Sequence, residues 1–322
     1  MKSYERVKEF NIMDEDWDAL IILDACRYDF FSRFYERFLK GDLRKVWSSG
    51  SCTQEWFYNT FKEKYKDTVY FSANPYINSM KFINRPRIRQ CFYLNYIRAS
   101  NHFKFVVDVW LYGWDRYLGT VLPNMMNKLV LSKLDKTRGH RLIIHFIQPH
   151  APYITPHYFI QGFQRPDPRK AIFLSNRGHP VYKILKLIDL LCKPLDIGNG
   201  MTLQLGELLG VPPISPLDAV RRHFGIKGLR KAYAENLLIV LEYLTDLIPY
   251  LPGKVVITSD HGEFLGERFQ FSHPCKSKHR IVRCVPWLEV NKVMKVKPYF
   301  KRYPLKLKLK IIKRELYRSS SK

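Results

Sequence analysis

Residues 255–263 read Val-Val-Ile-Thr-Ser-Asp-His-Gly-Glu, an apolar, β-branched run that ends in an acid, an imidazole and a glycine. Such a run is typical of a buried strand in a parallel sheet. Because ligands of open α/β sheets bind beyond the carboxyl ends of the strands, Asp260 and His261 are predicted to lie at that edge. A carboxylate oxygen beside an imidazole nitrogen suits zinc or manganese better than calcium or magnesium. An acid after a strand is also a common helix N-cap, so this pair alone does not establish a metal site.

A second stretch near the N-terminus has the same design. Residues 19–24 read Ala-Leu-Ile-Ile-Leu-Asp, so a second apolar strand ends in an acid, Asp24. Another apolar run covers residues 141–147, and the clearest helical stripe covers residues 229–247. Strands that alternate with helices predict an α/β fold, a mostly parallel central sheet with helices on both faces. Two acids at two strand ends of one sheet can share one metal.

Length and charge narrow the class of protein. The chain has 322 residues, of which 46% are hydrophobic and 15% aromatic, enough for a large core. Its 54 Lys and Arg against 29 acids give a net charge of +25. This excess predicts an anionic partner or substrate, such as nucleic acid, anionic lipid headgroups or phosphorylated glycans.

The cysteines and the apolar segments bear on the compartment. The six cysteines include no C-x-x-C pair, which argues against a zinc ribbon and offers no clear disulfide framework. No run approaches the roughly 18 apolar residues of a membrane-spanning helix, and no apolar segment follows the N-terminal charges. We therefore expect reduced thiols and a cytoplasmic protein, with the inner membrane surface as a candidate contact.

The C-terminal segment differs in composition from the rest of the chain. Residues 292–322 carry twelve Lys or Arg and a single acid. We therefore divide the chain into a catalytic domain at 1–292, with an insertion at about 155–228, and a basic amphipathic tail at 293–322. The tail alternates with period two over 305–313, yet some of its apolar residues also fit one helical stripe. Three interpretations stay open: an amphipathic helix on an anionic membrane, a solvated tail, or a patch that binds nucleic acid.

Several short motifs follow one another in a familiar order. They are Leu-Asp-Ala-Cys-Arg at 23–27, a hydroxyl at a helix start within 51–53, His145 with Pro-His-Ala-Pro-Tyr at 149–153, and Ser-Asp-His-Gly-Glu at 259–263. Together the motifs resemble the alkaline phosphatase superfamily, in particular its sulfatase-like branch. The resemblance spans roughly residues 17 to 290. It implies cleavage or transfer of phosphate or sulfate esters through a covalent intermediate.

The resemblance also implies a site. It assigns a divalent metal, zinc or manganese, to Asp24, Thr53, Asp260 and His261. The segment 50–56, Gly-Ser-Cys-Thr-Gln-Glu-Trp, looks like the nucleophile segment of lipoteichoic acid synthase-type phosphotransferases. Thr53 is the preferred nucleophile, because a metal lowers the pKa of a hydroxyl that it binds. Ser51 is its competitor, and a plain N-cap is the alternative for either residue.

A second group of residues is implied near the first. These candidates for a second metal or for substrate binding are His145, His150, His273 and Arg27. A second metal site normally includes another carboxylate, and no Asp accompanies His145 or His150, so we expect one firmly bound metal. His145 lies within an apolar strand, where a structural histidine is the alternative.

The nucleophile segment departs from that of sulfatases. Cys52 is followed by Thr-Gln-Glu-Trp, without the arginine of a formylglycine motif. We therefore expect a metal-dependent phosphoesterase or phosphotransferase that acts on a phosphorylated lipid, glycan or polyol. The alternatives are a sulfuric ester hydrolase, or a non-catalytic basic scaffold that binds nucleic acid or an anionic membrane. Substrate and oligomeric state stay open.

Overall fold

A seven-stranded sheet forms the centre of the computed structural model, which describes residues 10–80, 99–165 and 199–320, with side chains to 315. The strand order is β2-β11-β8-β1-β7-β3-β4. The parallel strands are β8 (Val255–Thr258), β1 (Ala19–Leu23), β7 (Arg141–Phe146), β3 (Tyr65–Ser72) and β4 (Phe103–Asp108). Two further strands run antiparallel to their neighbours, β11 (Cys284–Val293) and β2 (Leu39–Trp47). The predicted mostly parallel sheet is confirmed.

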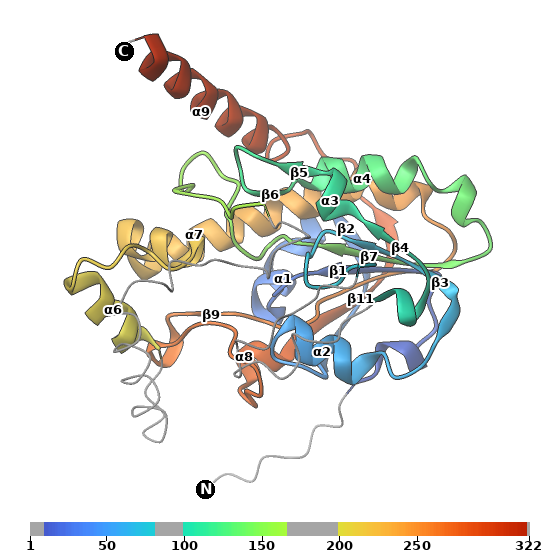
Figure 1. Cartoon of the computed structure of the whole chain (residues 1–322). Helices are drawn as coiled ribbons and strands as arrows, with labels where there is room; N and C mark the ends of the chain where they lie inside the picture. The colour runs from blue at the N-terminus through green and yellow to red at the C-terminus, as the bar shows by residue number, and fades with distance from the viewer. Residues whose placement is uncertain (1–9, 81–98, 166–198, 321–322) are drawn as a thin grey trace, which may run out of the picture.

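Helices cover both faces of this sheet because the central strand is apolar on both sides. Ile21 and Leu23 of β1 pack into one core, and Leu20 and Ile22 pack into the other. The first core receives α1 (Tyr28–Phe34), α4 (Pro123–Leu131) and α7 (Pro216–Leu247). The second core receives α2 (Thr53–Thr60), which lies below the sheet in Figure 1, whereas α4 and α7 lie above it. This layering explains the unbroken apolar run of β1.

The edges of the sheet were less predictable. Strand β11 does not lie at an edge, since it pairs with both β8 and β2. The edge strand β2 has the sequence Leu-Lys-Gly-Asp-Leu-Arg-Lys-Val-Trp, whose charges hide its strand character. The other edge strand, β4, comes from a stretch that no sequence pattern assigned.

The helix predicted at 229–247 is part of a longer one. α7 begins at Pro216, and the Ser215 hydroxyl caps it by accepting a hydrogen bond from the Asp218 N–H at 3.1 Å. The helix bends at Gly225, where φ is 65°. The last part of the expected insertion is therefore continuous with a core helix. The helical pattern at 182–192 lies outside the described residues.

The remaining elements are short, apart from the last helix. They are α3 (Val109–Tyr112), β5 (Trp114–Asp115) paired with β6 (Thr120–Val121), α6 (Gly200–Leu208), β9 (Phe264–Leu265) paired with β10 (Phe271–Ser272), α8 (Arg280–Arg283), α9 (Arg302–Ser320), and single 3-10 turns at 12–14, 35–37, 99–101, 135–137, 248–250 and 267–269. α9 projects from the body of the protein (Figure 1). Among the described helices, none combines the length and the apolar character that a membrane crossing requires.

The cysteines correct one expectation. Cys52 and Cys275 form a disulfide across a sequence separation of 223 residues. Cys26 and Cys284 are free thiols. The expectation of reduced thiols is therefore wrong for one pair, since cysteine spacing carries no information about partners so distant in sequence.

Candidate active site

Three neighbouring strands bring the first cluster together. Asp24 follows β1, Asp260 follows β8, and His145 lies in β7, on the other side of β1. The His145 Nε2 atom lies 3.7 Å from Asp24 Oδ2 and 3.9 Å from Asp260 Oδ2. All three side chains are buried, and together they form a group with metal-binding spacing. The acids of two strand ends thus meet, as the strand pattern predicted.

Thr53 and His261 complete this cluster. The Thr53 hydroxyl donates a hydrogen bond to Asp260 Oδ2 at 2.8 Å and lies 3.2 Å from His261 Nε2. The Nδ1 atom of His261 lies 2.8 Å from the carbonyl of Gly262, so this nitrogen carries the proton and donates it. The lone pair of His261 Nε2 therefore faces Thr53 and Asp260, the arrangement in which an imidazole binds a metal.

The electrostatics of this cluster fit a cation. Burial raises the pKa of Asp24 well above its ordinary value, and the facing Asp260 carboxylate raises it further. Burial lowers the pKa of His145 to about 4 and that of His261 well below its ordinary value, so both rings are neutral. Within the described structure, Asp24 Oδ1 and His145 Nε2 are buried without hydrogen-bond partners. Facing carboxylates, neutral imidazoles and unpaired donor atoms are what a bound divalent metal would satisfy.

Gly262 contributes close packing. A Cβ atom at this position would lie 2.1 Å from the carbonyl oxygen of Ile281, and the Gly262 N–H donates to the Val282 carbonyl at 2.9 Å. The structure requires glycine here for the approach of a second backbone segment. This contact fixes the chain directly after His261.

A second cluster lies beside the first and contains a residue that the sequence analysis missed. Glu263 Oε1 lies 3.1 Å from His273 Nδ1 and 3.9 Å from His150 Nε2, and the three form a second group with metal-binding spacing. Burial raises the pKa of Glu263, but the two histidines outweigh it and hold that pKa below its ordinary value. The rings of His273 and His261 are 4.4 Å apart. A carboxylate therefore does accompany His150, and its signal in the sequence was its place in the Asp-His-Gly-Glu motif. The number of bound metals, one or two, stays a prediction.

Ser51, the competing nucleophile, is engaged elsewhere. Its hydroxyl lies 2.8 Å from Glu55 Oε2 and from the Pro274 carbonyl, and it accepts the Ser277 N–H at 2.9 Å. Glu55 Oε2 also accepts the N–H groups of Ser51 and Lys276, at 3.0 and 2.9 Å. These bonds join the start of α2 to the loop after His273. The Cys52–Cys275 disulfide joins the same two segments.

Arg27 is likewise engaged in structure. Its guanidinium contacts Asp29 at 2.7 Å, Glu267 at 2.8 Å and the Glu263 carbonyl at 3.2 Å. Its side chain is only 6% exposed. These contacts hold the segment that carries Glu263, and a role of Arg27 in binding substrate or a second metal stays a prediction.

Two further supporting residues lie at or just after β3. The Asn74 amide donates to Asp24 Oδ2 at 2.7 Å, and the Tyr70 hydroxyl lies 2.8 Å from His145 Nδ1. They orient the side chains that face the cluster. The sequence held no signal for them, since their role depends on β3 lying next to β7.

Comparison with known protein families and with curated proteins finds no match. Solved structures are similar in fold. The soluble domain of lipooligosaccharide phosphoethanolamine transferase A from Neisseria meningitidis has 12% identity and a TM-score of 0.45, over 91% of this chain and 81% of that domain. A phosphonate monoester hydrolase from Silicibacter pomeroyi has 14% identity and a TM-score of 0.43, over 84% of this chain and 67% of that one. The chain spans only 47% of the integral membrane form of the Neisseria transferase.

The expected cytoplasmic location is corrected, because the Cys52–Cys275 disulfide contradicts the reduced thiols on which that expectation rested. Another similar structure is the C-terminal periplasmic domain of a phosphoethanolamine transferase from Campylobacter jejuni, with 12% identity and a TM-score of 0.39 over 84% of this chain and 77% of that domain. A disulfide such as Cys52–Cys275 is typical of oxidising compartments. Reduced thiols and the lack of an apolar leader had supported the cytoplasmic prediction, and the first of these grounds fails. In fold, the chain is similar to these transferase domains and to the phosphonate monoester hydrolase.

Proposed function

We propose that this protein is a metal-dependent phosphotransferase or phosphoesterase with Thr53 as its nucleophile. The observation that carries the proposal is the position of the Thr53 hydroxyl, 2.8 Å from Asp260 Oδ2 and 3.2 Å from the neutral His261 ring. It is the hydroxyl of this buried cluster, whereas Ser51 is bonded to Glu55 and to the loop after His273. Phosphoric ester chemistry also agrees with the transferases and the hydrolase whose folds are similar.

The residues that would hold the metal are Asp24, Thr53, Asp260 and His261. Their oxygen and imidazole donors favour zinc or manganese. The bound ion would supply Lewis acidity, which lowers the pKa of the hydroxyl and offsets the charge that builds up on phosphoryl oxygens. The cluster of His150, Glu263 and His273 would bind those oxygens or a second cation.

The chain's own groups can perform a two-step transfer. Thr53 Oγ1 attacks the phosphorus as Asp260 Oδ2 accepts its proton, and the ester P–O bond breaks as the leaving alcohol takes up a proton from solvent. Water or an acceptor alcohol then attacks the phosphothreonine and gives up a proton to solvent, while the Thr53 oxygen leaves phosphorus and takes back the proton held by Asp260. The Cys52 side chain makes no capping hydrogen bond, so N–H groups in the first turn of α2 can donate to phosphoryl oxygens.

The substrate that we propose is a phosphorylated lipid, glycan or polyol, outside the cytoplasm. Its anionic character agrees with the net charge of +25. The location agrees with the disulfide and with the similar periplasmic domains. The domain division at residue 292 remains part of this proposal.

Substitution of Thr53 tests the proposal. Thr53→Ala should reduce turnover of p-nitrophenyl phosphate or its diester by at least about 10³-fold, because the nucleophile is gone. Thr53→Ser should keep part of the activity, and Ser51→Ala is the matched hydroxyl control. Metal content of the Thr53→Ala protein, measured by mass spectrometry, should stay near wild type, whereas Asp260→Asn should lose both metal and activity. Normal turnover in Thr53→Ala, or turnover only of p-nitrophenyl sulfate by wild type, would contradict the proposal.

A further inference from the structure

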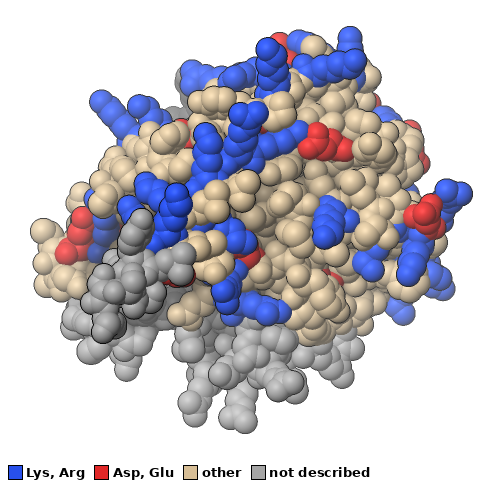
Figure 2. All heavy atoms as spheres, turned by 90° about the horizontal axis from the view of Figure 1, so that it is seen from above, with Lys and Arg blue, Asp and Glu red and all other residues tan. Residues whose placement is uncertain are grey.

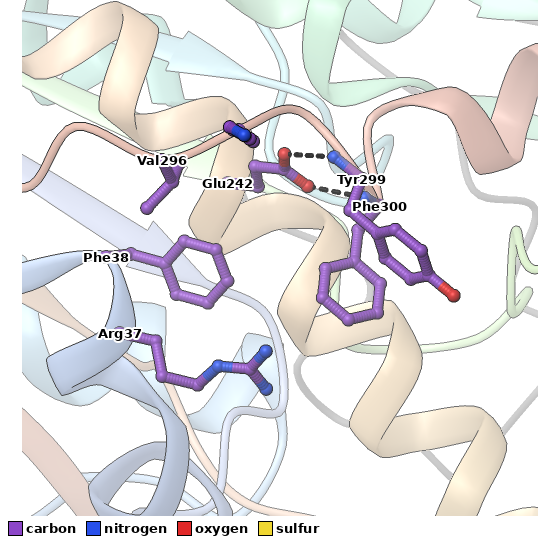
Figure 3. Close-up of a pocket in the computed structure, with 7 residues that line it drawn as sticks. Arg37, Phe38, Glu242, Val296, Tyr299 and Phe300 are labelled. Atoms are coloured by element: carbon purple, nitrogen blue, oxygen red, sulfur yellow. Dashed lines mark hydrogen bonds between the residues drawn. The ribbon is translucent and has the colours of Figure 1, made fainter.

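The base of α9 is fixed to the catalytic body. Glu242, buried on α7, accepts hydrogen bonds from the N–H groups of Tyr299, Phe300 and Lys301 at 2.7, 2.6 and 3.1 Å. Figure 3 shows this carboxylate pointing at the segment that leads into α9. Since three donors converge on one buried acceptor, the direction in which α9 leaves the body is determined.

One apolar stripe of α9 packs against the body. Tyr303 and Leu307 are 6% and 3% exposed, and they pack in a cluster with Ile239 of α7, while Ile311 lies at its edge. These three positions are spaced i, i+4 and i+8, which places them on one side of a helix. The contact accounts for three of the six Leu, Ile and Tyr residues between positions 302 and 315.

A second apolar stripe points the other way. At 100° per residue, Leu305, Leu309 and Ile312 lie about 170° around the helix from the docked stripe. Leu305 is 63% exposed and Leu309 is 51% exposed. The period-two alternation of the sequence therefore reflects a helix with apolar residues on two opposite sides. Packing within the described part of the protein explains only one of them.

Basic side chains flank the exposed stripe. Arg302, Lys306 and Lys313 are exposed on one flank, and Glu315 is the single acid between positions 302 and 315. On the other flank, Lys308 pairs with Asp115 at 2.8 Å. Figure 2, seen from the side on which α9 projects, shows Lys and Arg spread widely over this face and Asp and Glu in only a few places. The stripe thus has exposed cations on one flank, whereas the cation on its other flank is paired with Asp115.

We propose that this outer face of α9 docks on the surface of an anionic phospholipid bilayer. The leucines would enter the boundary between headgroups and acyl chains, and the flanking cations would contact lipid phosphates. The phosphates of a nucleic acid would pair with the basic side chains, but the apolar stripe would have no role in such a complex. A second copy of the chain would bring the same positive flanks face to face, because a two-fold interface pairs a patch with itself. The bilayer is the partner that uses both features.

The test measures sedimentation of the full chain with vesicles and does not depend on catalytic activity. Binding is expected with phosphatidylcholine vesicles that contain about a third phosphatidylglycerol, and not with phosphatidylcholine alone. Leu305→Gln/Leu309→Gln should weaken this binding about tenfold or more, because two leucines lose their apolar insertion. The matched control is Leu208→Gln/Leu209→Gln, which removes two leucines that are 81% and 59% exposed on and after α6.

Each outcome decides between partners. Loss of vesicle binding in the α9 variant alone, with unchanged turnover of a small phosphoester, supports the proposal. Equal loss in the control variant, or unchanged binding in the α9 variant, overturns it. A wild-type chain that shifts duplex DNA but ignores vesicles also overturns it, in favour of nucleic acid. So does a dimer in analytical ultracentrifugation that the α9 variant abolishes, since the stripe would then be a self-interface.

Discussion

Removal of the Cys52–Cys275 disulfide should weaken the whole fold as well as the site. The bond closes a loop of 223 residues between the residue before Thr53 and the loop after His273. In the chain-entropy description, a loop of that length in the unfolded state corresponds to about 5 kcal/mol, and measured losses for native disulfides are about 2–5 kcal/mol. We therefore expect Cys52→Ala/Cys275→Ala to lower the free energy of unfolding by about 2–5 kcal/mol, a large share of typical domain stability.

Urea unfolding measures this loss. The double variant should show a lower midpoint at a similar m-value, and wild type treated with dithiothreitol in the unfolded state should approach it. Cys284→Ala is the control, since Cys284 is a free, half-buried thiol, and its change should stay below about 1 kcal/mol. A double variant within about 0.5 kcal/mol of wild type would show that the loop-closure reasoning does not apply to this chain.

Kinetic measurements on the same double variant show whether the disulfide also positions the active-site residues, apart from its effect on the free energy of unfolding. The hydrogen bonds from Glu55 Oε2 to the N–H groups of Ser51 and Lys276 join the same segments and remain after the substitution. Without urea, where the protein is fully folded, we therefore expect Cys52→Ala/Cys275→Ala to lower kcat/KM by about tenfold or less. Adding Glu55→Gln to this double variant should lower kcat/KM by a further large factor. Additive effects of the two changes would mean that the links act independently.

Two other predictions concern single residues around the site. Burial raises the pKa of Glu267, but the Arg27 guanidinium outweighs burial and holds that pKa below its ordinary value. A carboxyl group whose pKa is lowered by folding stabilises the protein above its ordinary pKa. This contribution to the free energy of unfolding is lost as the pH falls through the pKa of the folded state. Glu267→Gln should therefore destabilise the protein at pH 7, by an amount that shrinks to nothing in acid below both pKa values, and a constant difference in urea midpoint from pH 7 to pH 3 would contradict this. Gly262→Ala should lower both metal content and turnover strongly, because the new Cβ would lie 2.1 Å from the Ile281 carbonyl oxygen; wild-type metal content and turnover in this variant would show that the backbone contact does not hold His261 in place.

Local rules placed the two acids of the first cluster, whereas His145 had been grouped with His150 and His273 and lies in the first cluster instead. Asp24 and Asp260 each come directly after an apolar, β-branched run, and parallel strands bring such ends to one edge. Thr53 lies at a helix start that glycine and hydroxyl residues mark. For these residues the strand order β8-β1-β7 was the only non-local information needed.

The second cluster and its supports depend on contacts that no local pattern encodes. Glu263 meets His150 and His273 through the fold, and the search for a partner acid near the histidines in sequence missed it. The motif that contains Arg27 gave no indication of its ion pairs with Asp29 and Glu267. The many charged residues of β2 likewise gave no indication in the sequence that this segment is a strand.

Hydrogen-bond accounting separates the residues that shape this cleft from those that face a ligand. Ser51 and Arg27 have their polar atoms satisfied by the protein, which identifies them as structural. In the described part of the protein, Asp24 Oδ1, His145 Nε2 and Glu263 Oε2 are buried without partners. An unpaired buried polar atom costs about 1–3 kcal/mol, and a bound ion would offset this cost for the atoms that it contacts. A non-catalytic scaffold that binds the same ion would differ from the proposed enzyme in the role of the Thr53 hydroxyl.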